Sequence, residues 1–107
     1  MLPFTEGDLK KSFNPSYLAR GEEYWEVGRV FKLKIDNQGT HISAMVRGRK
    51  AASYVTNVRI SAKKTPIRID GTCTCPIFSN CKHVAATLYQ ALQQQELELN
   101  EEDENQL

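Results

Sequence analysis

Apolar residues recur along this chain with two periods, three to four residues near its ends and two residues in its middle. The helical period starts early. Thr5 and Asp8 can cap a first short helix reciprocally. Asn14 then stands as the N-cap of a second helix, near residues 15 to 27, whose first residue is a proline. Gly28 is suited to end that helix in a left-handed conformation.

One side of the second predicted helix is mainly aromatic and apolar. Its members follow one another at three- and four-residue spacing: Tyr17, Leu18, Gly21, Tyr24 and Trp25. A stripe of this kind usually packs into a core. We therefore interpret these residues as core, and Gly21 as a position where a neighbouring strand comes close.

From Arg29 onwards the apolar period changes to two. The alternating segments lie near residues 31 to 35, 42 to 46, 54 to 60 and 67 to 69, with short polar connections between them. Short connections between alternating strands are typical of an antiparallel meander with one buried and one wet face. Most of the basic residues fall on the predicted wet face, namely Lys32, Lys34, Arg47, Arg59 and Arg68.

The helical period returns near Cys81 and is expected to end at about Gln95. Val84, Leu88 and Leu92 form the apolar stripe of this last helix. Residues 96 to 107 are acidic and contain no aromatic residue, so we predict a disordered tail there. The fold class is therefore α+β over residues 1 to 95: two N-terminal helices, a meander of three to four strands, and a C-terminal helix.

Composition narrows the class of protein. The chain has 107 residues, of which 40% are hydrophobic and 25% are charged, which is typical of one globular domain. No segment approaches the roughly 20 apolar residues of a membrane span. The first residues carry neither the basic start nor the apolar run of a secretory signal. We expect a cytoplasmic protein without a membrane partner.

The formal net charge of +1 averages over unlike segments. Residues 29 to 82 contain eleven lysines and arginines against two aspartates, whereas residues 96 to 107 contain six carboxylates and no base. A basic segment of this kind is typical of proteins that bind polyanions. The alternative, that the charged strand residues only solvate the outer face of the sheet, stays open.

All three cysteines and one of the two histidines lie within eleven residues, in the spacing C-x-C-x5-C-x-H. Cys73 and Cys75 lie in an extended segment, where residues i and i+2 project to the same side. Cys81 and His83 lie at the start of the last helix, where the helix dipole and Lys82 favour a thiolate. Three thiolates and one imidazole saturate a tetrahedral zinc ion, so the spacing predicts one closed, structural Zn²⁺ site.

Other roles for these cysteines can be weighed against zinc. An odd number of cysteines argues against a closed disulfide framework. A Cys73–Cys75 redox pair would leave Cys81 and His83 without a role, and the simplest alternative is three buried thiols beside an incidental histidine. Because the metal site is closed and no nucleophile–base pair or phosphate loop is evident, we expect neither an enzyme nor a small-molecule substrate.

The finger spacing, followed at once by an alanine-rich helix, resembles the SWIM-type zinc finger. Residues 17 to 30 are similar to the segment that precedes the finger in bacterial helicase-associated members, so the resemblance covers roughly residues 16 to 92, with the finger at 71 to 92. It implies DNA binding or protein interaction, in the bacterial cytoplasm or nucleoid. The ligands that it implies are Cys73, Cys75, Cys81 and His83.

The leading functional hypothesis is a zinc-stabilised module that binds nucleic acid, DNA rather than RNA, as an accessory domain of a helicase-like ATPase. The expected phosphate contacts are Arg47, Arg49, Lys50 and Lys82. Adjacent strands show no array of exposed aromatic residues, so sequence specificity is not expected. The alternative is a protein-interaction module that docks onto a helicase-like partner without touching nucleic acid, its basic face meeting an acidic surface or its own tail.

Overall fold

The computed structural model describes residues 1–49 and 52–105 and has the α+β architecture expected from the sequence. Four strands form one antiparallel sheet in the order β1-β2-β3-β4, which confirms the meander. Two helices precede the sheet and one follows it. The bounds of the elements are α1 Glu6–Ser12, α2 Pro15–Glu26, β1 Val30–Asp36, the 3₁₀ turn η1 Asn37–Gly39, β2 His41–Arg47, β3 Ser53–Ser61, β4 Arg68–Cys73 and α3 Lys82–Asn105.

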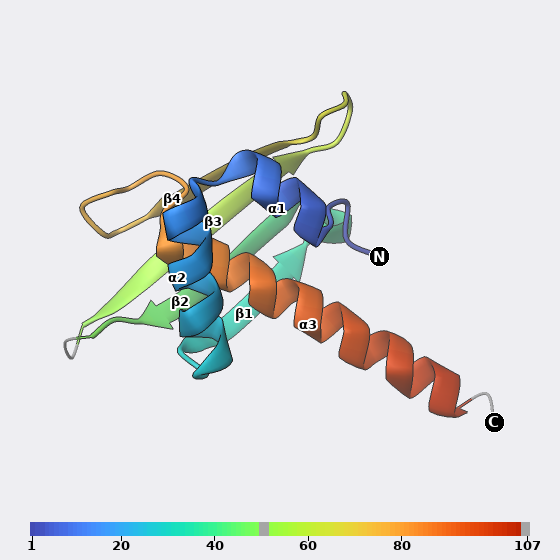
Figure 1. Cartoon of the computed structure of the whole chain (residues 1–107). Helices are drawn as coiled ribbons and strands as arrows, with labels where there is room; N and C mark the ends of the chain where they lie inside the picture. The colour runs from blue at the N-terminus through green and yellow to red at the C-terminus, as the bar shows by residue number, and fades with distance from the viewer. Residues whose placement is uncertain (50–51, 106–107) are drawn as a thin grey trace.

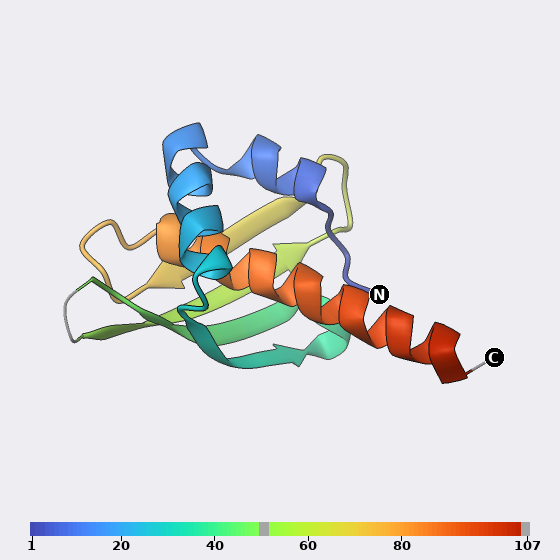
Figure 2. The ribbon, with the colours of Figure 1, turned by 60° about the horizontal axis from the view of Figure 1, so that its bottom comes forward.

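The elements are arranged in layers, with α3 lying across one face of the sheet and α2 packed against α3 (Figures 1 and 2). Alternate residues of the strands face α3 and are buried, among them Ile42, Val58 and Ile69. They meet Val84 and Leu88 of α3 in the main core. The apolar residues that recur every second position in the strands and every third or fourth position in α3 therefore form the two sides of one interface.

The opposite face of the sheet carries the basic residues and, within the described residues, no helix covers it (Figure 2). All five strand bases predicted for the wet face are exposed. Two of them form ion pairs with an aspartate two residues further along the same strand. Lys34 Nζ lies 3.8 Å from Asp36 Oδ2, and Arg68 Nε lies 2.8 Å from Asp70 Oδ2.

The predicted helix caps are confirmed. Asp8 Oδ2 accepts a hydrogen bond from the Thr5 backbone N–H at 2.8 Å, which completes a capping box at α1. Asn14 Oδ1 accepts from the Ser16 N–H at 2.9 Å at the start of α2. After α2, Gly28 has a φ of 75°, in the left-handed region that a glycine enters without steric cost. These local interactions set where the chain turns before it enters the sheet.

Gly21 does permit a close approach, but the neighbour is a helix and not the strand that we expected. A Cβ atom at Gly21 would lie 2.5 Å from the Ala85 Cβ and 2.7 Å from the Lys82 carbonyl oxygen, both in α3. The first turn of α3 therefore fits against α2 only because residue 21 has no side chain. This contact fixes α2 beside the start of α3.

The last helix is longer than the sequence predicts. α3 continues to Asn105, whereas we expected it to end at about Gln95 and residues 96 to 107 to be disordered. Glutamate, glutamine and leucine dominate this part of the helix, and all three are good helix formers. The Gln94 side chain also donates to Glu98 one turn further on, at 3.3 Å. Residues 106 and 107 lie outside the described residues.

None of the helices in the described part of the chain has the length and apolar composition that a bilayer span requires.

Replacing Gly21 with alanine should destabilise the fold by about 1–3 kcal/mol, because the new methyl group would overlap backbone and Cβ atoms of α3. Gly7→Ala is the matched control: a Cβ there meets only the Thr5 hydroxyl at 3.5 Å. It should be neutral or stabilise the protein by up to about 1 kcal/mol. Thermal unfolding monitored by circular dichroism measures both, and equal midpoints would show that α2 and α3 are not in close contact.

Candidate metal centre

β4 delivers the first cysteine of the cluster. The strand runs through Gly71 to Cys73, beyond the end at Ile69 that the alternation predicts. Gly71 is needed at this point because a Cβ there would overlap Val84 Cγ1 of α3. Because Gly71 has no side chain, α3 packs directly against β4 at Val84, one helical turn after Cys81.

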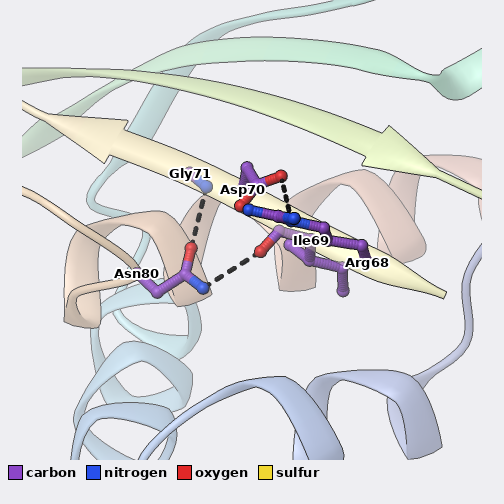
Figure 3. Close-up of polar contacts among 5 residues, drawn as sticks. All are labelled: Arg68, Ile69, Asp70, Gly71 and Asn80. Carbon is purple, nitrogen blue, oxygen red and sulfur yellow. Dashed lines mark hydrogen bonds and ion pairs between the residues drawn. The ribbon is translucent and has the colours of Figure 1, made fainter. Parts of the chain in front are cut away.

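The knuckle loop, residues 74–81, is tied back to β4 by one asparagine. Asn80 Oδ1 accepts from the Gly71 N–H at 2.8 Å, and Asn80 Nδ2 donates to the Ile69 carbonyl at 3.0 Å (Figure 3). Asn80 itself has a φ of 42°, a conformation that asparagine adopts more readily than most residues. Its side chain therefore holds the end of the loop against the strand that carries Cys73.

Backbone hydrogen bonds close the same loop from within. The Cys73 N–H donates to the Phe78 carbonyl at 2.7 Å, and the Phe78 N–H donates to the Cys75 carbonyl at 3.1 Å. Phe78 takes a left-handed φ of 69° to make this turn. The path that returns the chain from Cys75 to Cys81 is thus held by hydrogen bonds of the protein itself.

Cys81 is the N-cap residue of α3. Its carbonyl accepts from the Ala85 N–H at 3.0 Å, the first bond of the helix. The Val84 N–H, at the third helical position, lowers the pKa of the Cys81 thiol, as the N–H groups of a helix N-terminus do. His83 follows in the first turn. A thiolate at this place is stabilised by the unpaired N–H groups of the helix end and by the positive end of the helix dipole.

The four predicted ligands come together. The ligand atoms of Cys73, Cys75, Cys81 and His83 all lie within 4.8 Å of one another, and all four residues are buried. His83 Nδ1 lies 3.5 Å from Cys73 Sγ and 3.7 Å from Cys81 Sγ. A tetrahedral zinc ion with Zn–S of about 2.3 Å and Zn–N of about 2.0–2.1 Å separates its sulfur and nitrogen ligands by about 3.5–3.6 Å. The donors are thus placed to hold one metal ion, and their spacing suits zinc.

The sulfur atoms perturb one another strongly. The hydrogen bond from Cys73 lowers the pKa of Cys81 to about 4, helped by His83 and the Val84 N–H and opposed by burial. The same bond and burial raise the pKa of Cys73 far above its usual value. Without a cation, the cluster therefore favours one thiolate that is hydrogen bonded by a neighbouring thiol. A divalent ion would replace that proton and favour all three thiolates.

Two tyrosines orient the histidine ring. Tyr54 of β3 stacks on the His83 ring at 4.3 Å between centroids, and Tyr24 of α2 meets it edge-on at 5.5 Å. These contacts direct Nδ1 towards the sulfurs. His83 Nε2 is buried and has no hydrogen-bond partner among the described residues. Aromatic packing, rather than the hydrogen bond that usually orients a metal-binding imidazole, therefore sets the ring.

No protein-family model, curated protein or solved structure matches this chain.

The three predicted phosphate contacts that the structure describes do not lie on one face. Arg47 is exposed at the end of β2, where its guanidinium lies 5.3 Å from the centre of the Phe31 ring on the outer face of the sheet. Arg49 and Lys82 instead line a cavity beside the metal centre. Lys50 lies outside the described residues.

Sequence analysis missed two residues of that cavity, Arg20 and Tyr17. Both project from α2 towards the knuckle loop and line the same cavity as Arg49 and Lys82. Tyr17 is only half-buried, although its place in the aromatic stripe predicted a core residue. Their i, i+3 spacing puts the two side chains on one face of a helix. The sequence shows this spacing, but it does not show that this face of α2 lies beside the knuckle loop.

Protein prepared without added zinc should carry about one zinc ion per chain, because three thiolates and an imidazole are preassembled here. Cys75→Ser and His83→Ala should each abolish stoichiometric metal and lower the melting temperature sharply. Elemental analysis and thermal unfolding measure the two effects. The control is His41→Ala on β2, which removes a histidine outside the cluster and should leave the metal content unchanged. A well-folded wild-type protein without metal would contradict the assignment.

Proposed function

We propose that this chain is a SWIM-type module in which one structural zinc ion organises a nucleic-acid-binding surface. The observation that carries the zinc role is the buried Cys₃His cluster between β4 and α3. When bound, zinc at such a site supplies on the order of 10 kcal/mol of folding free energy. That is comparable with the whole stability of a small domain, about 5–15 kcal/mol. Three thiolates and one imidazole would fill a four-coordinate zinc ion, so the site would keep no position for a catalytic water.

The charges around the metal centre support nucleic acid as the partner. Arg47 and Arg49 adjoin the connection between β2 and β3, and Lys82 begins α3 beside the knuckle loop. The knuckle loop and the adjoining ends of β2 and β3 lie at the same end of the molecule in both views (Figures 1 and 2). Among the described side chains, the ion pairs involve Lys34 and Arg68 and none of these three bases. These cations lie at one end of the molecule, Arg49 and Lys82 in the cavity and Arg47 on the outer face of the sheet. Exposed cations of this kind are typical of phosphate-binding surfaces.

The helicase connection comes from the resemblance to SWIM-type proteins. Such a module would hold nucleic acid next to an ATP-driven motor supplied by another domain or subunit. A backbone-directed electrostatic contact suits that role, because a motor must bind any sequence that it moves along. DNA in the cytoplasm or nucleoid of a bacterium is the proposed partner.

The DNA contact predicts a strong dependence on salt. The wild-type chain should bind labelled DNA with an affinity that falls steeply between 50 and 200 mM salt. Arg47→Glu/Arg49→Glu should weaken binding about tenfold or more and reduce the slope of log K against log salt by about 2. Fluorescence anisotropy over a salt series measures both quantities.

Lys63→Glu/Lys64→Glu is the matched control. It changes the net charge by the same amount, in the exposed loop between β3 and β4 at the other end of the molecule (Figure 1). Its effect on affinity should be small. Equal losses in the two double variants would show that only total charge matters. Failure of the zinc-loaded wild type to bind any DNA would favour a protein partner instead.

A further inference from the structure

We propose that the cavity beside the metal centre binds one nucleotide of a single strand, with the phosphate on its cations and the base on Tyr17. This inference rests on the proposed nucleic-acid function and specifies its ligand. The cavity, of about 560 Å³, is lined by Arg49 and by residues of α2, β3, the knuckle loop and the start of α3, and three of the candidate metal ligands, Cys75, Cys81 and His83, form part of its wall. Its volume falls within the range of about 300–1,000 Å³ for pockets that bury small molecules.

Three cations from three separate parts of the fold converge on this cavity. Arg20 comes from α2, Arg49 from the residues after β2, and Lys82 from the first turn of α3, and no carboxylate is among the lining residues. A zinc ion held by three thiolates and one histidine carries a net charge of about −1. The three cations carry a charge of +3, of which a metal centre of charge −1 would neutralise one unit. The lining of the cavity would therefore keep a net charge of about +2. An anion such as a phosphodiester would take up this excess.

Two of the three tyrosines in the cavity are already committed to structural contacts. The Tyr24 ring has the Arg29 guanidinium and the Lys82 ammonium group each 5.1 Å from its centre, and it meets His83 edge-on. Tyr54 stacks on His83 with one face and lies close to Gly48, where a Cβ would be 2.7 Å from its ring. These two rings hold the metal ligand and the lysine in place.

Tyr17 is the tyrosine of the cavity whose ring is free to stack on a base. It is half-buried and, among the described residues, stacks on no other aromatic ring. It lies one helical turn before Arg20, and across the cavity the knuckle loop contributes Pro76 and Ile77, the latter 51% exposed. An aromatic ring and apolar side chains next to cations match the two halves of a nucleotide, its base and its phosphate.

A single strand suits this cavity better than a duplex. Bases of an intact duplex are paired and stacked, so their flat faces cannot lie against a tyrosine inside a concave site. A single strand offers unstacked bases along a flexible backbone. Stacking on a tyrosine tolerates every base because each has an aromatic face. The contact therefore specifies the form of the nucleic acid and not its sequence.

The test compares binding of the zinc-loaded full chain to a labelled 12-nucleotide oligothymidylate, to a duplex of the same length and to AMP. The single strand should bind about tenfold or more tightly than the duplex. Tyr17→Ala should weaken single-strand binding about tenfold with little change in salt slope, and Tyr17→Phe should restore it, because stacking needs only the ring. Arg20→Ala should weaken binding and lower the salt slope by about 0.7.

Phe78→Ala is the matched aromatic control, since Phe78 is 61% exposed on the knuckle loop but does not line the cavity. It should bind the strand like the wild type. The assignment of Tyr17 would be overturned if Phe78→Ala weakened binding of the single strand and Tyr17→Ala did not. It would also be overturned if AMP bound as tightly as the strand. The chain could also bind the duplex as tightly as the single strand, in a salt-dependent way that Tyr17→Ala does not change. That result would refute this inference but would leave the proposed function standing. Absence of binding to any of the three would refute both.

Discussion

Crowding of three sulfur atoms and one imidazole into a buried cluster is the constraint on which the rest of the molecule depends. Sulfurs held this close disfavour joint ionisation: the pKa of Cys73 is raised and that of Cys81 is lowered. A divalent ion would remove this conflict and would link β4 to α3. Gly71, Asn80 and the N-terminus of α3 all serve to bring the donors to this one point.

The same arrangement organises the surface around the centre. Because Gly21 lets α2 lie against the first turn of α3, the helix face that carries Tyr17 and Arg20 lies beside the knuckle loop. Tyr24 orients His83 with its edge and holds Lys82 over its ring. One set of contacts therefore positions a metal ligand and cations of the cavity together, and loss of the metal should disturb both.

Predictions that depended on neighbouring residues were the accurate ones. The Thr5–Asp8 and Asn14 caps involve atoms two or three residues apart, so the chain encodes them directly. Alternation of apolar residues predicted the strands for the same reason. The predicted ends of β4 and α3 were wrong. A glycine, which ordinarily weakens a strand, is required where Val84 packs on β4. An acidic segment of good helix formers continues the established helix α3.

The sequence by itself determined the candidate metal donors, because C-x-C and C-x-H spacing next to a strand end and a helix start is the pattern of a four-coordinate metal site. It could also show that the middle of the chain is basic. Only the tertiary structure decided which bases meet: Arg20, Arg49 and Lys82 are far apart in the chain and share a cavity because α2, the sheet and α3 pack together. Local spacing specifies ligands within a motif, whereas a surface built from three elements depends on how their faces pack.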